Sequence, residues 1–284
     1  MTGAEAILYT LVLYKLLLVG IGLWASRRTR DTGDFFLGGR RLGAWVAAIS
    51  ASASSSSAWT LVAVAGMAYL WGWPALWLFP ATVSGFVINW LWVAPRLMRA
   101  SRTNGSITLT EFLAGPDAYE GWPRRIVLLA SGVVLFSFTF YVAAQFQAAG
   151  SAFASAFELE MGHAIAIGAA VVLLYTLLGG FWAVSVTDTL QGLVMAATAL
   201  VLPVAAVLAA GGPGAVAAAL AAQEAGGGPP TAGIAALGFV LGTLGIGLGY
   251  PGQPHVVNRF MALRDPRALR DARVIALSWA VIIY

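Results

Sequence analysis

The sequence contains no cysteine and carries little charge. Only 10% of its 284 residues are charged, whereas a soluble domain usually carries about 25%. Without cysteine the chain has no disulfide framework, no thiolate metal site and no thiol nucleophile. Sixty per cent of the residues are hydrophobic, which is more apolar surface than one aqueous core can hide. The composition therefore indicates a membrane protein.

Signatures of enzymes are also missing. The two histidines, His163 and His255, are far apart and have no carboxylates near them in the sequence, so they do not predict a metal site. No nucleophile with a paired base and no phosphate-binding loop is present. The first apolar run ends in Arg27 and Arg28 without a small-residue cleavage site, which does not fit a secretory signal. We therefore expect neither catalysis nor a cleaved leader.

The sequence contains several long apolar segments. A helix needs about 20 mostly apolar residues to cross the hydrocarbon core. Seven segments qualify, and an eighth is under way where the sequence stops. They are residues 6–26, 43–70, 74–95, 126–155, 161–180, 184–210, 232–250 and 274–284. We expect one all-α transmembrane domain over residues 1–284, cut within its last span and hence a fragment.

All fifteen arginines fall in alternate loops, at residues 27–41, 96–125 and 259–273. Cytoplasmic loops of membrane proteins carry an excess of Lys and Arg. The pattern predicts that these loops are cytoplasmic in a bacterial-type inner membrane and that the N-terminus is outside. A nucleic-acid patch would not alternate in this way, so the net charge of +4 does not indicate nucleic-acid binding.

The connecting segments carry their own signals. Residues 110–113, ended by Pro116, predict a short helix within the second arginine-rich loop. Asp265 and Pro266 predict a helix start. Residues 211–231 are rich in Gly, Pro and Ala and predict an external linker.

Two of the spans are interrupted by residues that disturb a helix. The span 43–70 carries six serines near its middle, at positions 50, 52 and 54–57. Serine hydroxyls can open a helix, and hydroxyls with freed carbonyls would suit Na⁺; small residues that pack helices closely are an equal explanation. The span 232–250 runs into Gly249-Tyr250-Pro251-Gly252-Gln253-Pro254. This segment predicts either irregular backbone lining a cavity or a frayed helix end.

Few polar side chains lie inside the spans. Asp188 near the start of span 184–210 is either functional or a carboxylate at the positive end of a helix dipole. Tyr141 and Gln145 share one helix face and could contact a solute or a neighbouring helix. Lys15 in the first span is best explained by snorkelling towards the interface.

Three segments resemble motifs of the sodium:solute symporter family, most of all its sodium/proline branch. They are Phe35–Gly43 (FFLGGRRLG), Gly179–Gln191 (GGFWAVSVTDTLQ) and Gly247–His255 (GLGYPGQPH). They resemble the family patterns D-[YF]-[FIL]-L-G-G-R-x-L-G, G-G-[FL]-x-A-V-x-x-T-D-x-x-Q and G-Y-x-G-Q-P-H, in the same order and at similar spacing. The likeness extends from about Thr32 to Arg273.

The resemblance implies the leucine-transporter-like fold of two inverted five-helix repeats, with the first repeat complete and the second truncated. It implies Na⁺ as the coupling ion, held by the carbonyls of Ala53 and Ser56 with Ser55, Ser57 and Asp188 nearby. Tyr250 and Pro254 match solute contacts of the proline branch. With Trp59, Tyr141 and Gln145 they are the predicted solute-binding residues.

Two positions depart from the proline branch, which has an aspartate at Ser55 and a tryptophan at Ile246. The resemblance implies Na⁺-coupled uptake of a small organic solute, such as proline or a related amino acid, by a protein that contacts the lipid bilayer. Two alternatives stay open: a proton-coupled carrier using Asp188, and the transporter-like sensor domain of a histidine kinase. The sequence sets no oligomeric state.

Overall fold

The computed structural model describes all residues except 1–2, 28, 117, 158–159, 226–227 and 231, so Arg28 of the first arginine-rich loop lies outside the description. The described chain is helical, and its one isolated β-bridge joins Leu42 to Leu263. Within the described residues, five helical stretches are long and apolar enough to cross a membrane. They are Glu5–Ser26, Trp73–Thr103, Gly121–Ser155, Met161–Ala209 and Gly233–Gly252.

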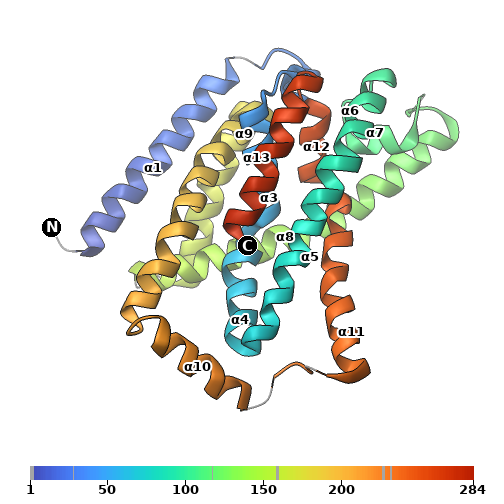
Figure 1. The fold of residues 1–284 in the computed structure, drawn as a ribbon. Helices are drawn as coiled ribbons and strands as arrows, with labels where there is room; N and C mark the ends of the chain where they lie inside the picture. Colours follow the sequence, from blue (N-terminus) through green and yellow to red (C-terminus); the bar gives the residue numbers. More distant parts are fainter. Residues whose placement is uncertain (1–2, 28, 117, 158–159, 226–227, 231) are drawn as a thin grey trace.

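The first arginine-rich loop folds into short helices. Helix α1 (Gly3–Ser26) leads into α2 (Thr32–Leu37) and a 3₁₀ turn over Gly38–Arg40. Figure 1 shows α1 at the edge of the molecule, where it packs along α9. Gly38 and Gly39 both have positive φ angles, 58° and 62°, a backbone region that glycine enters without steric cost. The glycine pair of the first motif therefore makes a tight turn.

The serine-rich span is broken where its sequence predicts disturbance. Helix α3 (Ala44–Ala58) contains Ser57 at φ 47° and ψ −172°, followed by a π-helical segment, Trp59–Val64, and by α4 (Ala65–Trp71). A positive φ on a residue other than glycine is uncommon and marks strain held by its surroundings. The break and the polar serines explain why this segment is not among the five helical stretches that are long and apolar enough to cross a membrane.

The next part of the chain contains the second arginine-rich loop. A 3₁₀ turn (Trp73–Trp77), α5 (Leu78–Val87), a π-helical segment (Ile88–Val93) and α6 (Ala94–Thr103) run as one stretch. The short helix expected at 110–113 is confirmed as α7 (Leu109–Ala114). Thr108 and Glu111 close a capping box at its start, which satisfies two backbone donors. Helix α8 (Gly121–Phe157) follows.

The break expected between the segments 161–180 and 184–210 is present, and one other boundary differs from the structure. Helix α9 (Met161–Ala209) is interrupted by a kink at Gly180, where φ is 56° and ψ is −153°. A Cβ on Gly180 would lie 2.8 Å from the Phe35 ring, so glycine is required for α2 to pack into the bend. The expected linker 211–231 contains a helix, α10 (Pro213–Ala225), because its alanines favour helix once Pro213 starts it.

The second interrupted element continues beyond residue 250. Helix α11 (Gly233–Leu244), a 3₁₀ segment (Gly245–Gly252) and α12 (Pro254–Ala262) form one broken element. The frayed-end interpretation is therefore wrong, because α12 follows the break and is largely buried. The expected loop 259–273 is wrong at its start, because Arg259 lies on α12, whereas the helix start expected within it at Asp265 and Pro266 is present. Only Leu263–Asp265 separates α12 from α13 (Pro266–Ile283).

Asp265 caps α13, as its sequence predicts. Its carboxylate accepts a hydrogen bond from the Ala268 N–H at 2.7 Å and an ion pair from Arg264 at 2.9 Å. Both interactions favour the charged form and hold the pKa of Asp265 below its usual value.

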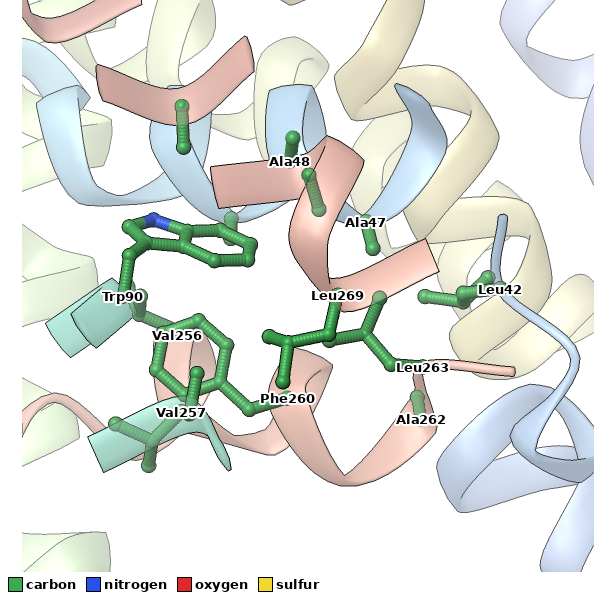
Figure 2. Packing of buried hydrophobic residues seen from close by; sticks show 14 of the residues in the cluster. Leu42, Ala47, Ala48, Trp90, Val256, Val257, Phe260, Ala262, Leu263 and Leu269 are labelled. Carbon is green, nitrogen blue, oxygen red and sulfur yellow. The ribbon is translucent and has the colours of Figure 1, made fainter. Parts of the chain in front are cut away.

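The core forms around α12. Its apolar residues pack on α3 and α6, and the same cluster includes residues of α13. Figure 2 shows the rings of Trp90 and Phe260 next to each other in this cluster. Their ring centroids are 4.8 Å apart in an edge-to-face arrangement, which aromatic pairs prefer. Helix α12, which follows the second interruption, is thereby packed against α3, which precedes the first.

The three arginine-rich loops lie at one end of the molecule. Arg40 donates to Ser101 and to the carbonyls of Ser106 and Met261. Arg102 donates to the carbonyl of Arg264 at 2.7 Å. Each arginine therefore connects one loop to another by donating hydrogen bonds to backbone carbonyls near helix ends.

Candidate cation and solute site

The two interruptions meet. The Ser55 hydroxyl donates to Oε1 of Gln253 at 3.0 Å, which joins α3 to the residue that precedes α12. Asn89, 1% exposed, donates from Nδ2 to the Tyr250 carbonyl at 3.2 Å. Polar side chains thus support the irregular backbone within the protein, as non-helical backbone at membrane depth requires.

The break at Ser57 redirects backbone donors. The Ala58 N–H donates to Oε1 of Gln145 on α8 at 2.9 Å, and the Trp59 N–H to the Ser57 hydroxyl at 3.2 Å. In a continuous helix these N–H groups would donate hydrogen bonds to the carbonyls of Ser54 and Ser55. Carbonyl oxygens beside the break are thereby separated from their helical partners, and such oxygens are the ligands that Na⁺ uses in broken helices.

The residues predicted to hold the cation lie around this break. Ser56 is fully buried, and Ala53 and Ser55 are each 8% exposed. The Ser56 carbonyl accepts hydrogen bonds from the Thr60 hydroxyl and the Trp59 N–H, so a cation at that oxygen would compete with both. No cluster of three or more His, Cys, Asp or Glu is present in the described parts of the chain. The oxygens at the break include serine hydroxyls, backbone carbonyls and the amide oxygens of Gln145 and Gln253.

A cavity of about 510 Å³ opens beside the break. Its walls come from α3, α8 and the 3₁₀ segment, and Tyr250, 4% exposed, is their most buried residue. Four of the five predicted solute residues line it, namely Trp59, Tyr141, Gln145 and Tyr250, together with Ser55 and Ser57. Two further lining residues are Gln253 of the third motif and Ile246, which directly precedes that motif.

Pro254 lines a different cavity. This second hollow, of about 660 Å³, contains Asp188, His255 and Arg259 and reaches Phe35 and Thr108 towards the arginine-rich end. The structure therefore separates Pro254 from the other four predicted residues. The His255 ring packs between Phe138 and Tyr141, at centroid distances of 5.3 and 5.4 Å. Because Tyr141 lines the first cavity and His255 the second, this aromatic stack lies between them.

Asp188 is part of a buried polar network. Its Oδ2 accepts hydrogen bonds from Ser50 and Ser54 at 3.0 Å each and forms an ion pair with Arg259. The side chains of Arg259 and Asp188 are 4% and 16% exposed, so the pair is sheltered from water. It joins α3, α9 and α12 at the level of the breaks.

Sequence reasoning missed Arg259, Gln253 and Asn89. Arg259 was placed in a cytoplasmic loop because arginine was taken as a loop marker. Proline at the start of α12 followed by buried Val256, Val257, Phe260 and Met261 was a signal that the helix continues. Gln253 lies within the third motif, but no pattern assigned it a partner. Asn89 had no local signal, since its partner is a carbonyl 161 residues away.

The fold and the two broken helices define a class: a multi-pass α-helical membrane protein of the leucine-transporter type. A solved structure titled as the substrate-bound outward-open state of a Na⁺-coupled sialic acid symporter matches with a TM-score of 0.81 and 19% identity. The match covers 99% of this chain and 58% of that one. The all-α inverted-repeat fold expected from the sequence is confirmed, with α11–α13 in the place of the start of the second repeat.

Residues 35–284 match the model of the sodium:solute symporter family, and the chain belongs to this family. It is 34% identical over 277 residues to the osmoregulated proline transporter OpuE of Bacillus subtilis, and 34% identical over 283 residues to the sodium/proline symporter of Escherichia coli. These alignments cover 97% and 99% of this chain. The chain spans 56% of the length of each of these two relatives.

Proposed function

We propose that the complete protein is a secondary active symporter that couples Na⁺ entry to the uptake of a small organic solute, proline or a related amino acid. Such a carrier makes and breaks no covalent bond and is not an enzyme. The relatives named above are described as proline transporters, which supports the substrate class. Membership of the family supports the coupling ion.

One observation carries the proposal: two interrupted helices meet beside a cavity whose walls include both polar and aromatic groups. The Ser55–Gln253 hydrogen bond at 3.0 Å joins the interruptions. The cavity of about 510 Å³ is lined by Trp59 and Tyr250 with Gln145. A ligand pocket typically combines such apolar surface with a few fixed polar groups. A small amino acid fits this combination.

The cation is proposed to bind at the carbonyls of Ala53 and Ser56, with the hydroxyls of Ser55 and Ser57 close by. Na⁺ asks mainly for oxygen dipoles in a cavity of its size, and the break in α3 supplies them without a carboxylate. Asp188 lies in the neighbouring cavity, and we propose that it stands further along the cation's exit path.

Uptake of labelled solutes by cells or vesicles containing the complete protein tests the proposal. A panel of proline, other small amino acids and sugars is measured with Na⁺, Li⁺ or neither cation. We expect proline-class uptake that requires Na⁺. Uptake that ignores Na⁺ and follows the proton gradient would contradict the choice of ion, and a sugar as the best substrate would contradict the solute class.

Proton coupling through Asp188 is the second candidate, favoured by the position of this carboxylate in a cavity. Its Oδ2 is held by Ser50, Ser54 and Arg259, so the carboxylate is tied into a network of three helices. Abolition of proton-driven uptake by Asp188→Asn, in a variant shown to be folded at the assay temperature, would favour the second candidate.

We also propose that the protein lies in a bacterial-type inner membrane with its arginine-rich end in the cytoplasm and its N-terminus outside. The ties that Arg40 and Arg102 make between the three loops support a single arginine-rich face. Positive charge on one face favours the cytoplasmic side.

A further inference from the structure

A polar hollow unrelated to the solute cavity lies at the arginine-rich end. It has a volume of about 340 Å³ and lies between the end of α1, α2 and the bend of α9. Its lining residues are Arg27, Thr29, Arg30, Asp34, Gly38, Arg41 and Trp182. Three arginines against one aspartate give the hollow a net charge of +2.

The arginines of this hollow are largely unneutralised. Asp34 already accepts a bond from Arg41 at 2.6 Å, while its other oxygen accepts the backbone N–H of Arg30. Within the described residues, the guanidinium groups of Arg27 and Arg30 have no ion pair. Two planar guanidinium groups facing one hollow match the geometry of a phosphate.

The Trp182 ring forms one wall of the hollow. The positive φ of Gly38, 58°, lets the α2 turn close over this ring, since a Cβ there would lie 3.3 Å from it. The indole nitrogen is inaccessible to water, so an anion in the hollow would be held by the arginines and not by this donor.

The surroundings distinguish a lipid from a free anion. Helix α1 is the outermost helix, and Leu23, one turn before Arg27, is 52% exposed. Phe35 and Phe36 of α2 are also partly exposed, but they line the second hollow, which contains Asp188. The charged hollow therefore adjoins exposed apolar surface on its α1 side, so a single amphiphile could place its phosphate among the arginines and its acyl chains along α1.

We propose that this hollow binds the phosphate headgroup of an anionic phospholipid. Basic pockets between helices on the cytoplasmic side are a recognised way of holding such headgroups. The inference rests on insertion in a membrane and not on the proposed solute or coupling ion.

Titration of the purified complete protein in neutral detergent with phosphatidylglycerol, followed by native mass spectrometry, tests the proposal. We expect binding to weaken about fivefold for each arginine removed in Arg27→Gln and Arg30→Gln, because each contributes on the order of a fivefold factor near a lipid phosphate. Trp182→Phe, which keeps an aromatic wall and removes only a nitrogen that the hollow does not reach, is expected to leave binding unchanged. Arg99→Gln, on an exposed arginine of α6 at the same end, is the matched control and is expected to leave binding unchanged.

Three outcomes would overturn the proposal. If Arg99→Gln weakened phosphatidylglycerol binding as much as Arg27→Gln or Arg30→Gln, the binding would reflect general attraction to a basic face and not this hollow. Equal binding of phosphatidylcholine would show that the anionic headgroup is not recognised. Displacement of phosphatidylglycerol by the same concentration of inorganic phosphate would assign the hollow to a free anion. The thermal midpoint of each variant in lipid-free detergent checks folding. If both arginine variants unfold, the comparisons with phosphatidylcholine and inorganic phosphate, which use the unchanged protein, decide the question.

Discussion

At the scale of single residues, Asp188 and Arg259 form the most buried of the ion pairs between described residues. Burying two charges is costly, and their attraction offsets that cost only when the remaining hydrogen-bonding positions are filled. Ser50 fills two of them, since it donates to Asp188 at 3.0 Å and accepts from Nε of Arg259 at 2.5 Å. Arg259 also donates to the His255 carbonyl. The pair therefore depends on three helices being in place.

We expect Asp188→Asn to destabilise the protein by about 3–5 kcal/mol, because it leaves Arg259 charged and unpaired in a buried site. The matched control is Asp265→Asn, which removes an exposed ion pair but keeps a residue that caps α13; a much smaller loss is expected. Denaturation midpoints of the purified variants measure both effects. Adding Arg259→Gln to Asp188→Asn should recover part of the loss of stability. Equal losses for Asp188→Asn and Asp265→Asn would refute the view that Asp188 and Arg259 form a buried pair that stabilises the fold.

Ser55 offers a second test at this scale. Ser55→Asp is expected to raise the apparent affinity for Na⁺ on the order of tenfold, since a nearby negative charge attracts the cation at low dielectric. The Oε1 of Gln253 that now accepts from Ser55 would repel the new carboxylate, but rotation of the amide presents its NH₂ group instead. Na⁺-dependence of solute uptake measures the change. Ser55→Asn, of similar size and neutral, should leave it unchanged; an equal rise would show that charge is not the cause.

The sequence predicts some of these residues and not others, for a physical reason. Ser55 and Tyr250 lie in segments whose composition already disturbs a helix, and a motif marks them. Gln145 shares a helix face with Tyr141, but its bond to the Ala58 N–H depends on a break elsewhere in the chain. Arg259 was misplaced because its partner, Asp188, is 71 residues away, and pairing between distant residues leaves no local pattern.

At the scale of elements, close packing of small residues holds the second break in place. The 3₁₀ segment Gly245–Gly252 packs on α5. A Cβ on Gly85 would lie 2.5 Å from the Tyr250 ring and 3.0 Å from the Gly247 carbonyl. Only a glycine at position 85 allows Tyr250 to lie flat against α5 beside the cavity, as small residues allow elsewhere in membrane helices.

Gly85→Ala is therefore expected to push the Tyr250 ring towards the solute cavity. Overpacking of this kind costs about 1–3 kcal/mol, and the half-saturation concentration for solute should rise. Gly242→Ala on α11, where nothing lies within 4 Å of the added Cβ, is the control and should be neutral. Thermal unfolding and solute uptake are measured for both. A neutral Gly85→Ala would mean that Tyr250 is not held by this contact.

Element type was predictable where periodicity was strong, and element ends were not. Asp265 marked a helix start correctly, because capping is local chemistry. The helix predicted over residues 110–113 begins one residue earlier, at Leu109, after its cap Thr108. The bend at Gly180 is set by Phe35 of another helix, so the sequence around it shows only a pair of glycines. The helix over Pro213–Ala225 was missed because glycines and prolines at its edges obscured the alanines within it.

At the scale of the whole molecule, the fold has two chemically different ends. One end gathers Arg27, Arg30, Arg40 and Arg102 around the α2 turn and the start of α13. Helix α10 lies at the opposite end, and Figure 1 shows it crossing the base of the molecule away from α2 and α12. This polarity was readable from the spacing of arginines alone, because insertion in a membrane acts on loops before tertiary contacts form.

The two ends make the orientation directly testable. The chain has no native cysteine, so a single introduced thiol is the only reactive one that the 284 residues supply. We expect Ala217→Cys on α10 to react with a membrane-impermeant thiol reagent in intact cells, and Asn104→Cys, which follows α6 at the arginine-rich end, to react only after the cells are opened. Both positions are exposed, so each should react fully in permeabilised cells, which serves as the control. Reaction of Asn104→Cys but not Ala217→Cys in intact cells would invert the proposed topology. It would also move the proposed phospholipid pocket to the outer leaflet, where the positive-inside rule gives no reason for arginines to gather.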